Sequence, residues 1–220
     1  MFTDVEGIFT ADPRYDQQSY DEILRRDAEC LSGAGVLMAS SVEFGRRYNV
    51  PIIVKSTFTN NKGTVVKEKT MEEAIVSGVT HNDKEVKFTL FGVPDQPGIA
   101  GTVFGSLSEI GTNVDMIVQN VSKESITDIS FTAPSEQQKD VEDTLKNISK
   151  QLDAKGYDVD ENIARISIIG AGMKSESGVA SKMFKTLGDN KINISMISTS
   201  PIRVSCVISS NDIEKALNVL

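Results

Sequence analysis

Two segments of the chain combine a glycine, placed just before a predicted helix, with side chains that could bind a small charged molecule. Gly98 and Gly178 each precede such a helix. Backbone N–H groups at a helix start can bind a carboxylate, and the helix dipole assists them. Near the first glycine, Asp95, Asp115 and Gln119 offer oxygen acceptors for an ammonium group. The combination suits an α-amino acid, which carries both charges, although an aspartate at such a position is more commonly a helix cap or a solvated surface residue.

Other chemistries have little support in the sequence. Phosphoryl transfer needs positive charge or a metal around the phosphates, a backbone cradle and a placed nucleophile, and no Walker-type loop supplies the cradle. His81 is the only histidine, which excludes histidine-rich metal sites and leaves a single partner for any serine or cysteine nucleophile. We therefore predict no catalytic residue and no metal site in this chain.

The two glycines belong to a sequence repeat with a constant offset of 80 residues, the difference between 98 and 178. Residues 94–119 and 174–199 align without a gap. The identical or similar positions are Gly98, Ile99, Ala100, Phe104, Leu107, Asn113, Val114, Met116 and Ile117 in the first copy, and Gly178, Val179, Ala180, Phe184, Leu187, Asn193, Ile194, Met196 and Ile197 in the second copy.

Each copy has the periodicity of alternating strands and helices. A β-rich run, at 86–93 or 163–169, leads to a helix whose apolar residues recur three and four positions apart. A strand pair follows, at 114–121 with 126–132 or at 192–199 with 202–209, and then a second amphipathic helix. The order β-α-β-β-α-β is that of a split βαβ module, so the predicted fold class is α+β.

The second copy lacks its last strand, because the sequence ends within the helix that begins near Asn211. An exposed sheet edge favours pairing with any available strand. The strand-like run at residues 74–80 stands just before the first copy, and we predict that it completes the second copy. The first copy, residues 84–160, is then inserted into a second module made of residues 72–81 plus 162–220. Residues 1–62 form a preceding part, where local pattern alone favours a turn-rich loop followed by a helix at 19–31.

The composition limits the partners. Acidic side chains outnumber basic ones by 31 to 23, and the net charge of -8 is accompanied by no basic run, so a nucleic acid would be repelled. Two cysteines are too few for a disulfide framework, and the start MFTDVEG lacks the basic and apolar parts of a signal peptide. No apolar run reaches the length of about 18 residues that spans a bilayer. We expect a cytoplasmic protein without nucleic-acid or membrane partners.

Six segments resemble the carboxy-terminal part of the aspartokinase family, whose tandem ACT domains sense amino acids. They are TDVEGIFTADPR, PDQPGIA, NVDMIVQN, TDISFT, ISIIGAGM and NISMISTS, and the similarity runs from residue 3 to residue 220. The resemblance implies two ferredoxin-like ACT domains, 84–160 and 72–81 plus 162–220, after a remnant, 1–62, of the amino-acid-kinase α/β domain. It also implies a regulatory portion that forms a homodimer through its ACT domains. This portion would bind lysine, threonine or both, for feedback control of the ATP-dependent phosphorylation of L-aspartate to 4-phospho-L-aspartate.

The resemblance also assigns candidate residues. Those that would contact the effector are Asp95, Gly98, Ala100, Asn113, Asp115 and Gln119 in the first copy and Asn193 and Ile194 in the second copy. The copies differ chemically, because Ser195 replaces Asp115 and Thr199 replaces Gln119, so they need not bind the same ligand. In the later stretch GAGVLMASSVEF, this chain has Gly35 where many members of the family have a lysine, and the connection after Arg14 is shorter than is usual in the family. The resemblance also covers the opening loop TDVEGIFTADPR. The residues of that loop that would touch ATP are Thr3, Asp4, Phe9 and Arg14, with the Arg14 guanidinium as the phosphate partner.

The catalytic start of the family is not found in this sequence, so we expect no aspartate kinase activity from the chain alone and no cofactor bound to it. By resemblance, ATP with Mg²⁺ serves the intact enzyme, and a separate catalytic kinase chain is a further candidate partner. Two alternatives stay open: a catalytically active reduced aspartate kinase, and a free-standing ACT amino-acid sensor that acts on another protein. ATP turnover with aspartate would favour the first, and copurification with a kinase chain would argue against the second.

Overall fold

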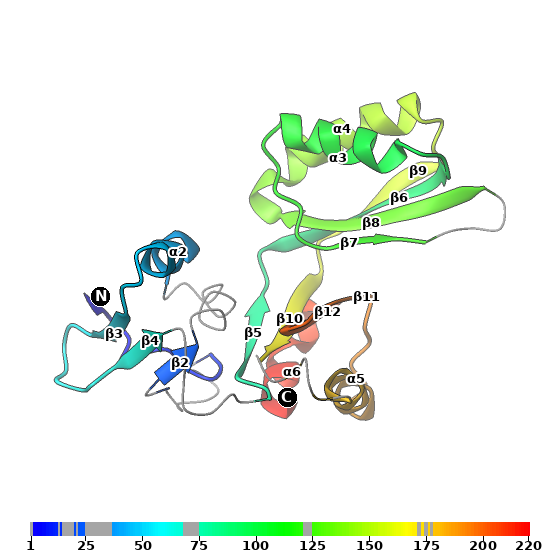
Figure 1. Ribbon diagram of the computed structural model, residues 1–220. Helices are drawn as coiled ribbons and strands as arrows, with labels where there is room; N and C mark the ends of the chain where they lie inside the picture. The colour runs from blue at the N-terminus through cyan, green and yellow to red at the C-terminus, as the bar shows by residue number, and fades with distance from the viewer. Residues whose placement is uncertain are drawn as a thin grey trace. The chain divides into compact units, whose positions relative to one another are not determined.

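The computed structural model describes residues 2–12, 14, 20, 22–24, 37–67, 75–120, 125–170, 173, 176 and 178–220. The chain divides into two compact units. One comprises Asp83–Ala164, and the other comprises Met1–Asn82 together with Arg165–Leu220. Figure 1 labels the helices and strands of both.

The unit Asp83–Ala164 is a four-stranded sheet with two helices on one face (Figure 1). The helices are α3 (Ile99–Glu109) and α4 (Gln138–Gln151). All pairs of neighbouring strands are antiparallel. The sheet has the order β7-β8-β6-β9, made of β6 (Glu85–Pro94), β7 (Ile117–Gln119), β8 (Ile126–Pro134) and β9 (Gly156–Asp160).

Alternate strand positions and the inner stripes of the two helices form the core of this unit. Phe88 on β6, Leu107 on α3 and Leu145 on α4 are fully buried, as the helical and strand periodicities predict. The ring of Phe131 stacks on that of Phe88, with 5.3 Å between the ring centroids, and meets Phe104 edge-on at 5.7 Å. Burial of each large apolar side chain contributes about 1.5–3 kcal/mol, so these contacts determine which face of the sheet carries the helices.

The second copy forms a sheet of the same kind within the other unit. Its order is β11-β12-β10-β5, and β5 pairs antiparallel with β10 from Gly78 opposite Ile169 to Asn82 opposite Arg165. A strand that precedes the first copy therefore fills the fourth position of the second sheet. It begins at Gly78, later than the run 74–80, of which residue 74 lies outside the described residues. The elements are β5 (Gly78–Asn82), β10 (Ile163–Ile169), α5 (Val179–Asp189), β11 (Met196–Ser200), β12 (Arg203–Ser209) and α6 (Ile213–Val219).

Two short connections lead into and out of the first copy. Residues 83–84 join β5 to β6, and residues 161–162 join β9 to β10. Because β5 and β10 are paired neighbours, both connections leave the second sheet from adjacent strands. The domain boundaries drawn from the sequence at residues 62, 72, 81, 84, 160 and 162 stay predictions.

Where the structure describes it, the opening part of the chain is a small mixed sheet packed against helix α2 (Ala39–Arg47). Its core contains Val42, Val54 and Val66, and Ile169 of β10 joins the same cluster. The predicted helix at 19–31 is wrong at residues 22–24, which form a strand parallel to β4; apart from Tyr20, the rest of that range lies outside the described residues. The sheet has the order β1-β3-β4-β2, and the elements are β1 (Phe2–Thr3), β2 (Glu22–Leu24), α2 (Ala39–Arg47), β3 (Ile52–Ser56) and β4 (Thr64–Lys67).

Among the described residues, no helix combines the length and the apolar character that crossing a membrane requires.

Two buried threonines of the first copy have opposite hydrogen-bonding states. Thr112 is 8 % exposed, and its hydroxyl has no hydrogen-bond partner among the described residues. The second copy has an apolar residue, Ile192, at the equivalent position. Thr132 is fully buried, and its Oγ1 accepts a hydrogen bond from the Met116 N–H at 3.3 Å.

Thr112→Val and Thr132→Val should therefore change stability in different directions. Valine at 112 removes an unsatisfied buried hydroxyl, so the free energy of unfolding should stay the same or rise by about 1 kcal/mol. Valine at 132 deprives the Met116 N–H of an acceptor, so the free energy of unfolding should fall by about 1–3 kcal/mol. Urea unfolding of the two variants measures the difference. Equal losses would show that the Thr112 hydroxyl has a partner after all.

Candidate functional site

The helix starts of the two copies have the same backbone conformation. Gly98 and Gly178 are the N-cap residues of α3 and α5, with φ of 96° and 102°. These left-handed conformations favour glycine. Each glycine carbonyl accepts the first helical hydrogen bond, from Thr102 N or Lys182 N, at 2.9 Å. Both glycines are exposed, and in the first copy the Ile99 N–H donates to the Gln96 carbonyl at 3.4 Å. The N–H groups in the first turn of a helix that lack a partner within the helix can bind an anion.

The polar candidates of the first copy lie around this helix start and along the neighbouring edge strand. Asp95 directly follows β6, is half-buried, and donates its N–H to the Ser125 carbonyl at 2.9 Å. The N-cap position belongs to Gly98 rather than to Asp95, so Asp95 is not the cap residue of α3. Ala100 lies half-buried in the first helical turn. Asn113, Asp115 and Gln119 are exposed, before β7 or at its end.

The strand directions separate Asp115 from the helix start of its own copy. β7 and β6 run the same way, because both are antiparallel to β8. The Asp115 N–H donates to the Thr132 carbonyl at 3.2 Å, and Thr132 pairs with Lys87 near the beginning of β6. Gly98 instead follows the far end of β6, after Pro94. At about 3.3 Å per residue, the stretch from Lys87 to Pro94 covers about 20 Å.

Gln119, by contrast, lies toward the end of the sheet that carries the helix start. It pairs with Ile129, which pairs with Leu90 in the second half of β6. The structure thus places Asp95, Ala100 and Gln119 toward the Gly98 end, and Asn113 and Asp115 toward the opposite end.

The second copy repeats this backbone with different chemistry. Asn193 is exposed and Ile194 is half-buried, as are their counterparts Asn113 and Val114 in the first copy. Ser195 stands in the place of Asp115, and both its N–H and its hydroxyl donate to the Val207 carbonyl, at 2.8 and 3.2 Å. The second copy therefore offers no negative charge at this position.

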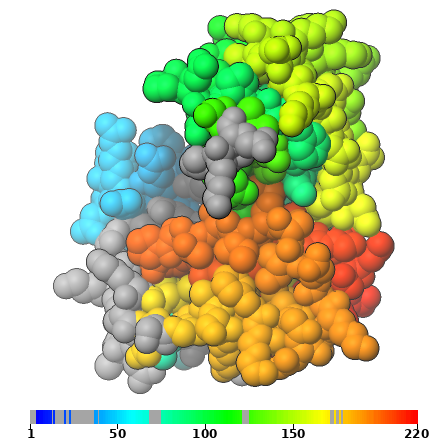
Figure 2. All heavy atoms as spheres, turned by 90° about the vertical axis from the view of Figure 1, so that its right-hand side faces the viewer, coloured from blue at the N-terminus to red at the C-terminus, as the bar shows by residue number. Residues whose placement is uncertain are grey.

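Both sheets end in an edge strand that presents apolar side chains to solvent. β7 and β11 are the outermost strands of their sheets, and Ile117 and Ile197 are 51 % and 44 % exposed. β11, in orange, lies at the surface shown in Figure 2. Unpaired strand edges with apolar side chains favour addition of another strand.

The candidate nucleotide contacts lie in the opening part of the chain. Thr3 pairs with Ser56, Asp4 is exposed and Phe9 is half-buried. The Arg14 guanidinium bonds to both carboxylate oxygens of Asp12, with 2.7 Å between Nη2 and Oδ2. The Arg14 hydrogen bond lowers the pKa of the Asp12 carboxyl. Asp12 bonds Nε and Nη2 of this guanidinium and offsets its positive charge, and the nucleotide contact stays a prediction. Gly35 lies outside the described residues.

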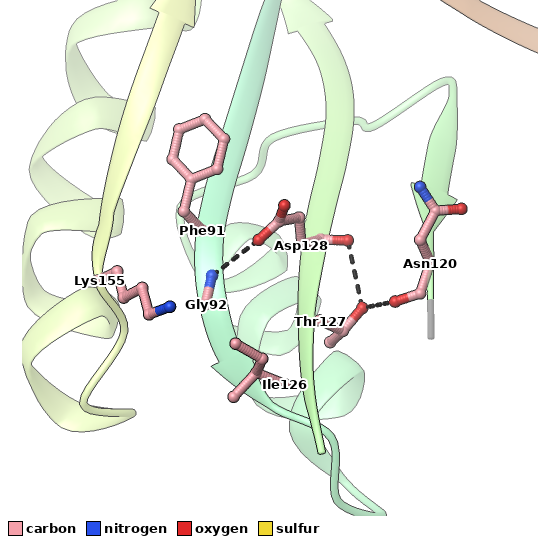
Figure 3. A pocket seen from close by; sticks show the side chains of 7 residues that line it. All are labelled: Phe91, Gly92, Asn120, Ile126, Thr127, Asp128 and Lys155. Atoms are coloured by element: carbon pink, nitrogen blue, oxygen red, sulfur yellow. Dashed lines mark hydrogen bonds between the residues drawn. The ribbon is translucent and has the colours of Figure 1, made fainter. Parts of the chain in front are cut away.

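The first copy also contains a cavity that the sequence did not predict, shown in Figure 3. It has a volume of about 310 Å³ and is lined by Phe91, Gly92, Asn120, Ile126, Thr127, Asp128 and Lys155. A glycine inside the apolar run LFGVP was the available signal, because glycine within a strand marks a bulge or a close approach. Among the described residues, no group of acidic, cysteine or histidine side chains could hold a metal ion.

Known proteins with similar sequences and structures are aspartokinases. Two sequence profiles, each described as an ACT domain, match residues 87–153 and 166–220. The chain is 41% identical to an aspartate kinase of Pseudomonas fluorescens (strain SBW25) over 230 residues, and to an aspartokinase of Mycolicibacterium smegmatis over 233 residues. In both comparisons the match covers 100% of the chain and 55% of the relative, so the chain spans about half the length of these relatives.

Two solved structures of aspartokinase subunits align with this chain over almost their whole length. A crystal structure of aspartokinase alpha and beta subunits is 38% identical, with a TM-score of 0.62, and covers 66% of this chain and 95% of its own. The regulatory subunit of aspartate kinase from Thermus thermophilus is 34% identical, with a TM-score of 0.63, and covers 66% and 96%. The chain therefore belongs to the aspartokinase family and contains its regulatory pair of ACT domains.

Proposed function

We propose that this chain senses lysine, threonine or both, at a seam between the ACT domains of two chains. The observation that carries the proposal is the separation described above: the helix start at Gly98 and the carboxylate of Asp115 lie toward opposite ends of one sheet, beside an unpaired edge strand. The first copy therefore contributes to two places: Asp95 and Gln119 lie toward its helix start, whereas Asp115 lies toward the other end of the sheet, where this copy has no helix start.

Pairing of the edge strands from two chains would complete both sites. In an antiparallel pair, the start of one strand lies beside the end of the other. If β7 of one chain pairs with β11 of a second chain, the Asn193 end of β11 comes next to Gln119 and the helix start at Gly98. At the other end of the seam, Asp115 comes next to the helix start at Gly178. Each completed site then combines an anion-binding helix start with one aspartate, Asp95 or Asp115.

This chemistry matches a free amino acid. The α-carboxylate would bind the N–H groups of the helix start, and the aspartate would bind an ammonium group. The two sites differ in their remaining residues, with Ala100, Gln119, Asn193 and Ile194 at one and Asn113 at the other. Such a difference allows two effectors, or one effector with two affinities. Because the ligand contacts both chains, its binding would stabilise the homodimer by a coupling of about 1–3 kcal/mol.

The controlled reaction, by family membership, is the transfer of the γ-phosphate of ATP to the side-chain carboxylate of L-aspartate, which gives 4-phospho-L-aspartate. ATP and Mg²⁺ would bind the part of the relatives that this chain does not match, either in the same polypeptide or in a separate kinase chain. Phospho-aspartate formation by the purified 220-residue chain, at a rate comparable with that of an intact aspartokinase, would instead favour the reduced-kinase alternative.

Asp115→Ala should weaken binding of the amino acid by more than about tenfold, because the ammonium group loses a charged acceptor. The control is Asp189→Ala at the end of α5, whose carboxylate forms an exposed pair with Lys185 at 2.7 Å and should leave binding unchanged. Calorimetric titration of the wild type and both variants with lysine and with threonine measures the effect. Equal losses in the two variants, or no heat with either amino acid, would end the proposal.

Ile117→Lys should dissociate the homodimer, because pairing at β7 would then bury an ammonium group at the seam. The dissociation constant in saturating lysine should rise by about tenfold or more. Ile110→Lys is a matched control, since Ile110 is 41 % exposed but lies at the end of α3 rather than on the edge strand. Sedimentation equilibrium gives the dissociation constants. A wild type that stays monomeric with either effector would contradict the seam.

A further inference from the structure

The cavity of Figure 3 is built around an irregularity in β6. Leu90 pairs with Ile129 and Val93 pairs with Thr127, so Phe91 and Gly92 together face Asp128 alone. This arrangement is a β-bulge, and Gly92 at its centre has a φ of 62°, in the left-handed region. The bulge turns the Gly92 N–H away from the regular ladder, and the Asp128 side chain accepts it, with 2.8 Å between N and Oδ1.

A lysine lies on the other side of the same glycine. The Lys155 N–H donates to the Phe91 carbonyl at 2.9 Å, which places the lysine just before β9. A Cβ on Gly92 would lie 2.6 Å from Cγ of Lys155, so the aliphatic stem of the lysine occupies the space that glycine leaves open. Figure 3 shows Lys155 and Asp128 on the two sides of Gly92. The bulge thus places one cation and one anion around a small cavity.

The two charged groups can each bind a further partner. Within the described part of the chain, the Lys155 ammonium makes no ion pair and Oδ2 of Asp128 makes no hydrogen bond. The remaining wall is partly apolar: Phe91 is 38 % exposed and Ile126 is half-buried. On the opposite side, the Asn120 carbonyl accepts a hydrogen bond from the Thr127 hydroxyl, which fixes the backbone there.

The equivalent place in the second copy has different side chains. Ser77 takes the position of Lys155, because its N–H donates to the Ile169 carbonyl at 2.6 Å. Gly170 takes the position of Gly92, and a Cβ on it would collide with the Ile75 carbonyl oxygen. Arg203 takes the position of Asp128. Each of them lies two residues before a serine, Ser205 or Ser130, that pairs with the edge strand of its own sheet. The second copy has neither the ammonium nor the carboxylate, so this constellation is specific to the first copy.

We propose that this bulge cavity binds an α-amino acid with an apolar side chain. The ligand carboxylate bonds to the Lys155 ammonium, the ligand ammonium bonds to Oδ2 of Asp128, and the side chain lies over Phe91 and Ile126. A volume of about 310 Å³ is at the lower end of the usual range for small-molecule pockets, about 300–1,000 Å³, which suits one amino acid. A single lysine supplies too little charge for a di- or triphosphate. The bulge cavity contains none of Asp95, Gly98 and Asp115, so this site does not depend on the proposed effector seam.

The test is an NMR titration of the full chain with L-methionine and L-leucine. Saturable shifts are expected at the backbone amides of Gly92, Asn120 and Lys155. Asp128→Asn keeps an oxygen for the Gly92 N–H, and Lys155→Met keeps the stem over Gly92, so both variants retain the bulge and lose only a charge. Each should weaken binding by about tenfold or more. N-acetyl-L-methionine and L-methionine amide each lack one of the two charges of L-methionine, so each should bind about tenfold or more weakly than L-methionine.

Matched controls are Asp143→Asn and Lys146→Met, at exposed positions of α4, and both should bind like the wild type. The proposal is overturned if neither amino acid gives saturable shifts at Gly92 and Lys155 up to its solubility limit, or if the controls lose as much affinity as the cavity variants. Shifts confined to Gly98 and Gln119 would also overturn it, while leaving the effector seam intact. If Asp128→Asn alters the spectrum throughout the first copy, Lys155→Met alone decides the outcome.

Discussion

The pairing of β5 with β10 is the constraint on which the order of the chain depends. β10 is buried at every position from Ile163 to Ile169, so an open edge on this strand would leave backbone groups without partners and out of reach of water. The strand that closes this edge is β5, which precedes the whole first copy in the sequence. The insertion of one ACT domain into the other follows from that single ladder of hydrogen bonds.

Periodic features of the fold can be predicted from the sequence, whereas features set by distant pairing cannot. Leu107 and Leu187 occupy the same phase of two repeated helices, and both are fully buried. The strand at Glu22–Leu24 is too short to carry a period, and it exists because β4, about forty residues later, pairs with it in parallel. Its local sequence favours a helix, and the tertiary pairing prevails.

The same distinction applies to the candidate site. The residue types around Gly98 and Gly178 are visible in the sequence, and the structure gives both glycines the expected helix-start position. The separation of Asp115 from Gly98 could not be read from spacing, because it depends on the direction of β7 relative to β6. Asp128 and Lys155 are still harder to connect, since only the ladder of β6 with its two neighbours brings them to the same glycine.

The two short connections between the sheets have a mechanical consequence. A domain held by one flexible linker can rotate freely about it, but the first ACT domain is held by residues 83–84 and 161–162, which start from adjacent strands of the second sheet. Two anchors side by side permit bending as a hinge and resist twisting. A displacement of the first domain must therefore pull on β5 and β10 together, and so act directly on the strand pair that closes the second sheet.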